Sequence, residues 1–144
     1  MEKALSMLGK DDALRTFETF RSDQGDPATW TIEDDGQVAR LVIKDVANPS
    51  RQCVISSPGV DWIIIDTDSG FTYGIFDEEM DDADVLKSLH LFVEISDAYF
   101  RGDWELVTAG RLLRRSTLKV NLPDGALTMQ RTLLDDVRHM LSGR

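Results

Sequence analysis

The sequence predicts one α+β domain spanning residues 1–144, with helices covering a mainly antiparallel sheet of about six to eight strands. Three observations indicate this class. The 144 residues are enough for one domain with its own core, and 42% of them are hydrophobic. Apolar and polar residues alternate over several short stretches in the first half of the chain. Short turn signals separate these stretches, and strands joined by such turns pair antiparallel.

A helix in two pieces is predicted near the N-terminus. Residues 2–9, EKALSMLG, form a first short piece that ends in Gly9. Residues 12–21 continue with apolar side chains at helical spacing, and Asp11 or Asp12 is the predicted N-cap. The sequence DQGDP then ends the helix, because proline cannot continue it.

Five consecutive strands are predicted next. Trp30 and Ile32 alternate with polar neighbours, and the turn DDG at residues 34–36 leads into the second strand. The predicted strands are residues 28–33, 37–45, 51–57, 60–67 and 71–77. Half-buried alternation of this kind indicates a sheet with one face covered by helices.

Residues 82–101 form the clearest predicted helix. Asp81 or Asp82 can cap its start, and Gly102 can end it. The remaining predicted elements are an ambiguous stretch at 104–110, strands at 116–122 and 126–130, and a final helix at 131–141. The predicted order is therefore α-β-β-β-β-β-α-β-β-α, with the ambiguous stretch as a possible further strand.

The net charge of −10 is unevenly distributed along the chain. Residues 1–105 carry 23 acidic and 9 basic side chains, whereas residues 106–144 carry 3 acidic and 7 basic side chains. An acidic surface repels nucleic acid and anionic membranes, so neither is an expected partner. The same surface attracts a basic protein and speeds the encounter with it, although acidity also serves solubility alone.

Cysteine content and hydropathy predict a cytoplasmic protein. Cys53 is the only cysteine, which excludes an intrachain disulfide and favours a reducing compartment. The longest apolar runs are a few residues, far too short to span a membrane. No apolar segment follows a basic one at the N-terminus, so no secretory signal is expected.

The stretch WIIIDTDSGFTY most resembles a catalytic motif. Its Asp66-Thr67-Asp68 is similar to the nucleophile loop of haloacid-dehalogenase-type phosphatases, where two aspartates act beside Mg²⁺. However, Gly70 stands where that loop has threonine or valine, and a strand follows instead of a helix. The spacing also differs from that of aspartic proteases and of EF-hand loops. We therefore predict that residues 66–70 form a hairpin turn.

No other sequence pattern predicts a catalytic residue, a cofactor or a metal site. Cys53 would need a base, and the histidines are His90 and His139, both in predicted helices. One cysteine and two distant histidines give no zinc spacing. The basic cluster Arg111 to Lys119 could bind phosphate, but pairing with the protein's own acids is the preferred interpretation. An enzyme with an unrecognised active site stays a third alternative.

The segment FDEEMDDAD is the most specific functional feature of the sequence. Six acidic residues lie within eight positions, between a predicted strand and a predicted helix. They are the predicted partner-binding residues Asp77, Glu78, Glu79, Asp81, Asp82 and Asp84. Helix capping needs one or two acids, and six repel one another, which favours a recognition role. The competing interpretation is a solvated helix start.

Length, charge and the order of elements resemble two classes of binding protein. Small acidic α+β chains of this kind resemble the immunity proteins of bacterial toxin systems, which implies a protein that neutralises a basic partner. The order helix, strands, helix, two strands, helix is similar to that of type III secretion chaperones, from which this chain differs by about two extra strands before the central helix. That resemblance implies a homodimer that binds an extended effector segment. Oligomeric state distinguishes the two hypotheses.

Overall fold

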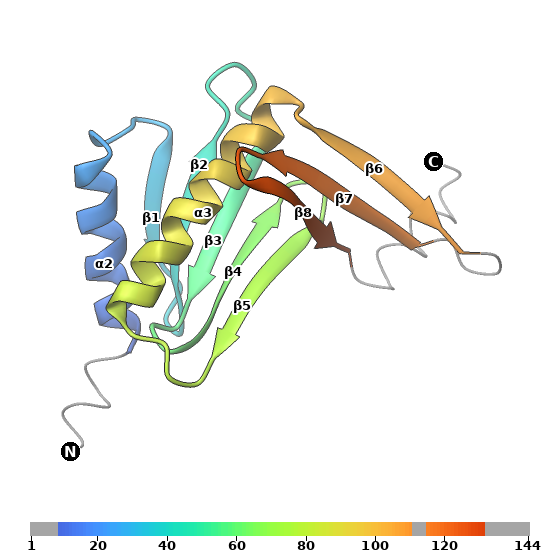
Figure 1. Cartoon of the computed structure of the whole chain (residues 1–144). Coiled ribbons are helices and arrows are strands. Elements are labelled where there is room, and N and C mark those ends of the chain that lie inside the picture. The colour runs from blue at the N-terminus through green and yellow to red at the C-terminus, as the bar shows by residue number, and fades with distance from the viewer. Residues whose placement is uncertain (1–8, 111–114, 132–144) are drawn as a thin grey trace.

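The computed structural model describes residues 9–110 and 115–131, which form two helices and eight strands (Figure 1). The elements are α2 Lys10–Asp23, β1 Trp30–Asp34, β2 Ala39–Lys44, β3 Gln52–Ser57, β4 Asp61–Thr67, β5 Thr72–Asp77, α3 Asp82–Arg101, β6 Trp104–Ala109, β7 Arg115–Leu122 and β8 Gly125–Gln130. The α+β class is confirmed, and the ambiguous stretch after α3 is strand β6. The helical piece predicted at residues 2–9 lies outside the described residues except for Gly9, and the final helix predicted at 131–141 lies outside them except for Arg131.

The eight strands form one antiparallel sheet in the order β1-β2-β3-β4-β5-β8-β7-β6. Strands β1 to β5 form a meander, in which each strand pairs with the next. The second meander, β6 to β8, joins the first through a single residue pair, Thr72↔Gln130. Strands β5 and β8 diverge from that point (Figure 1), so the sheet is nearly divided between them.

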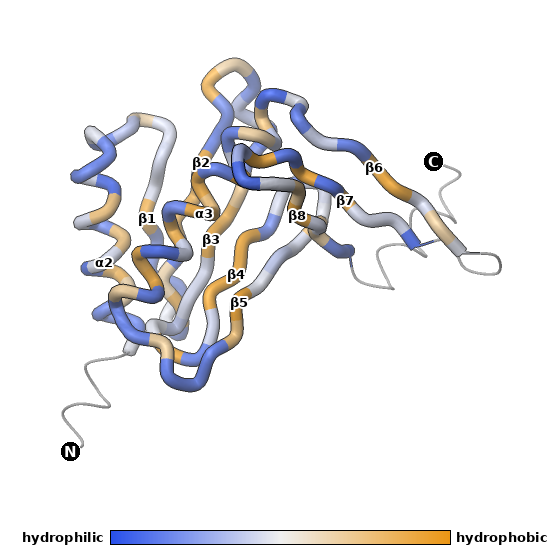
Figure 2. The backbone as a smooth tube through the Cα atoms, viewed as in Figure 1, coloured by the Kyte–Doolittle hydropathy of each residue, from blue (hydrophilic) through white to orange (hydrophobic). Residues whose placement is uncertain are grey.

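The core lies between the sheet and the two helices. One face of the central strands is apolar and buried, with Ile55 opposite both Leu41 and Ile65. Helix α3 contacts β3, β4 and β7, and α2 contacts α3 and β2. Figure 2 shows hydrophobic residues concentrated on β2, β4 and α3. Among the described helices, none is long and apolar enough to cross a membrane.

The start of α2 differs from the prediction. The N-cap is Gly9, whose backbone carbonyl accepts hydrogen bonds from the N–H groups of Asp12 at 3.1 Å and Ala13 at 3.2 Å. Asp12 is therefore inside the first turn, where its carboxylate pairs with Arg15. The prediction of Asp11 or Asp12 as N-cap was wrong, because the helix begins at Lys10.

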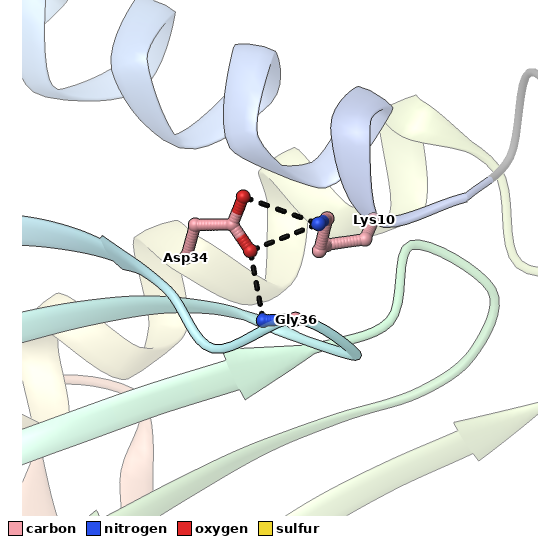
Figure 3. Close-up of polar contacts among 3 residues, drawn as sticks. All are labelled: Lys10, Asp34 and Gly36. Atoms are coloured by element: carbon pink, nitrogen blue, oxygen red, sulfur yellow. Dashed lines mark hydrogen bonds and ion pairs between the residues drawn. The ribbon is translucent and has the colours of Figure 1, made fainter.

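An ion pair fixes the start of α2 against the first hairpin (Figure 3). Lys10 Nζ lies 2.9 Å and 3.1 Å from the two carboxylate oxygens of Asp34. Asp34 also accepts a hydrogen bond from the backbone N–H of Gly36 at 2.9 Å, within the predicted turn. The hydrogen bond from Lys10 lowers the pKa of Asp34, and the same bond raises the pKa of Lys10.

Candidate functional site

The six predicted partner-binding residues lie on one corner of the molecule, where β5 ends and α3 begins. We call residues 77–84 the acidic corner. Met80 fixes this corner, because its side chain is only 1% exposed and its backbone N–H donates to the carbonyl of Asp77 at 3.1 Å. The predicted position between a strand and a helix is therefore correct.

Three of the six carboxylates bind the backbone of the corner itself. Asp81 is the N-cap of α3 and accepts from the N–H of Asp84 at 2.9 Å, while Asp84 accepts from the N–H of Asp81 at 3.1 Å. This reciprocal pair is a capping box. Asp77 accepts from the N–H of Glu79 at 2.9 Å. These three acids therefore have a structural role, which explains part of the acidic density.

The other three carboxylates have no such role. Glu78, Glu79 and Asp82 are exposed, and none of them forms an ion pair with a lysine or arginine of the described ranges. Their charges therefore face solvent from a fixed backbone. The structure separates the six acids into three that build the corner and three that are available to a partner.

A groove adjoins the corner, with a volume of about 460 Å³. Its walls come from β5, from α3 and from the turn between β7 and β8. The lining residues are Ile75, Asp77, Met80, Asp84, Lys87, Ser88, Leu91, Glu94 and Asp124. Four carboxylates and one ammonium group line the groove together with apolar side chains, so its net charge is negative.

Sequence reasoning missed Glu94 and Asp124. Glu94 lies on the same side of α3 as Lys87 and Leu91, a spacing that the helical periodicity could have revealed. Asp124 comes from a distant turn, and only the tertiary structure brings it to the groove. No local pattern in the sequence predicts that approach.

The predicted turn is confirmed as the connection between β4 and β5, but β4 extends to Thr67, so the connection comprises residues 68–71 instead of 66–70. Asp66 lies within β4 opposite Thr72, and Gly70 has the positive φ of 90° that favours glycine. Asp68 Oδ1 accepts from the backbone N–H of Gln52 at 3.0 Å and from the hydroxyl of Tyr99 at 3.1 Å. Asp68 therefore links the turn to β3 and to α3.

Cys53 and His90, the candidate nucleophile and base, lie in different environments. Cys53 is fully buried, and burial raises the pKa of its thiol to about 12, so the thiol is protonated at neutral pH. His90 is exposed on α3, and its ring lies nearly perpendicular to the ring of Phe20, with the two centroids 5.0 Å apart. His139 lies outside the described residues.

The basic cluster is described only in part. Arg115 and Lys119 lie on β7, whereas residues 111–114 are outside the described ranges. Lys119 forms an ion pair with Glu105 of β6 at 3.4 Å, as the preferred interpretation predicted. Arg115 donates to the backbone carbonyl of Arg131 at 3.2 Å.

Comparison with protein-family models, curated proteins and solved structures gives no match for this chain. Within the described part of the chain, no group of three or more His, Cys, Asp or Glu side chains is arranged to hold a metal ion.

Proposed function

We propose that this chain is a protein-binding module that neutralises a basic partner, in the manner of an immunity protein, with the acidic corner as its contact surface. One observation carries the proposal. Glu78, Glu79 and Asp82 present three exposed carboxylates from a backbone that a capping box and the buried Met80 fix in place. The groove beside them adds Glu94 and further carboxylates.

The physical basis is electrostatic attraction by a surface that loses little conformational entropy on binding. A negative surface attracts a partner rich in lysine and arginine and increases its association rate. The corner backbone is already ordered before binding, so the chain loses little conformational entropy there. Exposed charges at the rim of an interface act mainly on the association rate, and this effect is screened by salt.

A secretion chaperone-like homodimer is the second candidate, and the edge strand β6 favours it. Leu106 and Val107 are 51% and 44% exposed on this strand, which has no neighbour on its outer side among the described strands. An edge without a proline or an inward-pointing charge is open to pairing with another chain. A stable homodimer would favour this candidate, whereas a monomer that forms a tight heterodimer would favour the immunity-type function.

The test measures association with a partner recovered by pull-down from native lysate. The triple variant Glu78→Gln, Glu79→Gln, Asp82→Asn should associate more slowly than the unmodified chain, by about tenfold at low ionic strength. Its rate should also depend less on salt, because fewer charges contribute to attraction. Stopped-flow measurements at two ionic strengths give both quantities.

A matched control removes the same number and type of charges elsewhere. The control substitutions are Glu18→Gln, Glu33→Gln and Asp66→Asn. These three residues lie on α2, β1 and β4, and all are exposed. This control changes the net charge equally, so it should alter the rate much less if the location of the charge matters. Equal rates for the two triple variants would show that the acidic corner is only a solvated helix start.

A further inference from the structure

The outer edge of β5 is open where β8 diverges from it. Strand β5 pairs with β4 along its whole length, from Thr72 to Asp77. On its other side it pairs with β8 only at Thr72. Over the described residues, the edge from Gly74 to Asp77 therefore has no strand beside it. An open edge presents unpaired N–H and C=O groups that can bind another extended chain.

The register identifies which backbone groups face this open edge. Thr67 donates its N–H to the carbonyl of Phe71 at 2.8 Å, which makes these two residues a hydrogen-bonded pair. Such pairs alternate with non-hydrogen-bonded pairs along an antiparallel ladder. Tyr73 and Ile75 therefore bond to β4, whereas Gly74 and Phe76 direct their N–H and C=O groups outward. Along β5, residues whose backbone groups face the open edge therefore alternate with residues whose backbone groups are bonded to β4.

The two faces beside the edge differ in chemistry. Ile75 and Asp77 point toward the helix side, where they line the negatively charged groove. On the opposite face, Phe76 is 71% exposed and lies across from Trp62 of β4. A Cβ atom on Gly74 would lie 2.8 Å from Phe76 Cε2, so the ring folds over Gly74 on this face. One face therefore favours basic side chains, and the other favours apolar ones.

We propose that the open edge of β5 binds an extended segment of a partner protein as an added antiparallel strand, in which lysine or arginine alternates with apolar residues. The proposal rests on the proposed function, since it specifies how a basic partner is bound. Successive side chains of a strand point to opposite faces. Basic residues would then enter the groove near Asp77, Glu94 and Asp124, while apolar residues would cover Phe76 and Trp62.

Amide hydrogen exchange of the full chain tests the backbone part of this proposal. The probe is a short capped peptide in which lysine and valine alternate. Without peptide, the amides of Gly74 and Phe76 should exchange fast and those of Tyr73 and Ile75 slowly. Saturating peptide should slow exchange at Gly74 and Phe76 by about tenfold or more, because their N–H groups become hydrogen-bonded. Slow exchange at these two amides before peptide is added would overturn the proposal.

Backbone N-methylation of the peptide tests the hydrogen bonds directly. In an antiparallel pair, residues directly opposite each other lie on the same face of the sheet. The valines would therefore lie opposite Gly74 and Phe76, on the apolar face. Their amides would then form the hydrogen bonds to β5. N-methylation of the valines should weaken binding by about tenfold, and N-methylation of the lysines should change it little. Equal effects of the two modifications would overturn strand addition. A peptide with glutamate in place of lysine should not bind, because the groove is negative.

The experiment separates failure of this inference from failure of the proposed function. The groove variant Asp77→Asn, Glu94→Gln, Asp124→Asn should weaken binding of the lysine–valine peptide and reduce its salt dependence. Salt-dependent peptide binding without protection of Gly74 and Phe76 would overturn strand addition and leave the acidic contact surface standing. Two results together would overturn both strand addition and the proposed function. The peptide would fail to bind at millimolar concentration, and the corner variant and its control would associate with the partner at equal rates.

Discussion

At the scale of single residues, Asp68 shows that a sequence resembling a catalytic motif can have a structural role. Its carboxylate accepts two hydrogen bonds, from the N–H of Gln52 and from the hydroxyl of Tyr99. The Tyr99 hydroxyl also lies 2.9 Å from the hydroxyl of Ser69. Burial raises the pKa of Tyr99, so this hydroxyl stays protonated and can donate. An acceptor at position 68 is therefore required, whereas a negative charge is not.

We expect the double variant Asp66→Asn, Asp68→Asn to retain stability and binding. Asparagine keeps a side-chain oxygen that accepts both hydrogen bonds, so the free energy of unfolding should change by less than about 0.5 kcal/mol. Asp68→Ala removes the acceptor and should cost about 1 kcal/mol. Urea denaturation measures both variants. Calorimetric titration with Mg²⁺ and Ca²⁺ is the complementary measurement, and binding of either ion would contradict the structural interpretation of this turn.

At the scale of secondary-structure elements, the acidic corner combines two roles that variants can separate. Asp81→Ala removes the N-cap of α3 and should reduce the free energy of unfolding by about 1 kcal/mol. Asp82→Ala removes an exposed charge outside the capping box and should change stability by less than about 0.5 kcal/mol. Chemical denaturation gives both values. Equal losses for the two variants would contradict the division of the corner into structural and available acids.

The elements also show which parts of the fold were predictable. Strands β3 and β4 were predicted because helices cover one face of the sheet, so burial alternates along both of them. Strand β2 is instead buried at three successive residues, and β5 shows no alternation. Strand β6 was ambiguous because it lies at the sheet edge, where Leu106 and Val107 are exposed on opposite faces and no alternation results. The acidic corner was predictable from local density of charge. The groove was not, because Asp124 reaches it only through the tertiary structure.

At the scale of the whole molecule, helix α3 holds together two parts of the sheet that are barely joined by hydrogen bonds. The strands β1–β5 and β6–β8 share one residue pair, Thr72↔Gln130. The buried core nevertheless includes residues from both parts, with Leu118 and Met129 in the same cluster as Ile65. Helix α3 contacts β3 and β4 in one part and β7 in the other. The apolar core, and not the backbone ladder, therefore couples the two parts.

This coupling predicts that both parts unfold in one transition. Trp30 lies on β1 and Trp104 on β6, so each reports on one part of the sheet. Two variants isolate the signals: Trp62→Phe, Trp104→Phe retains Trp30, and Trp30→Phe, Trp62→Phe retains Trp104. In each variant, the urea midpoint from fluorescence should equal the midpoint from circular dichroism, because coincident probes indicate a two-state transition. Comparison within one variant cancels any change in stability that the substitutions cause. If Trp104 fluorescence changed at lower urea than circular dichroism, β6–β8 would unfold separately, and the open edge of β5 would belong to a hinge between two independently stable parts.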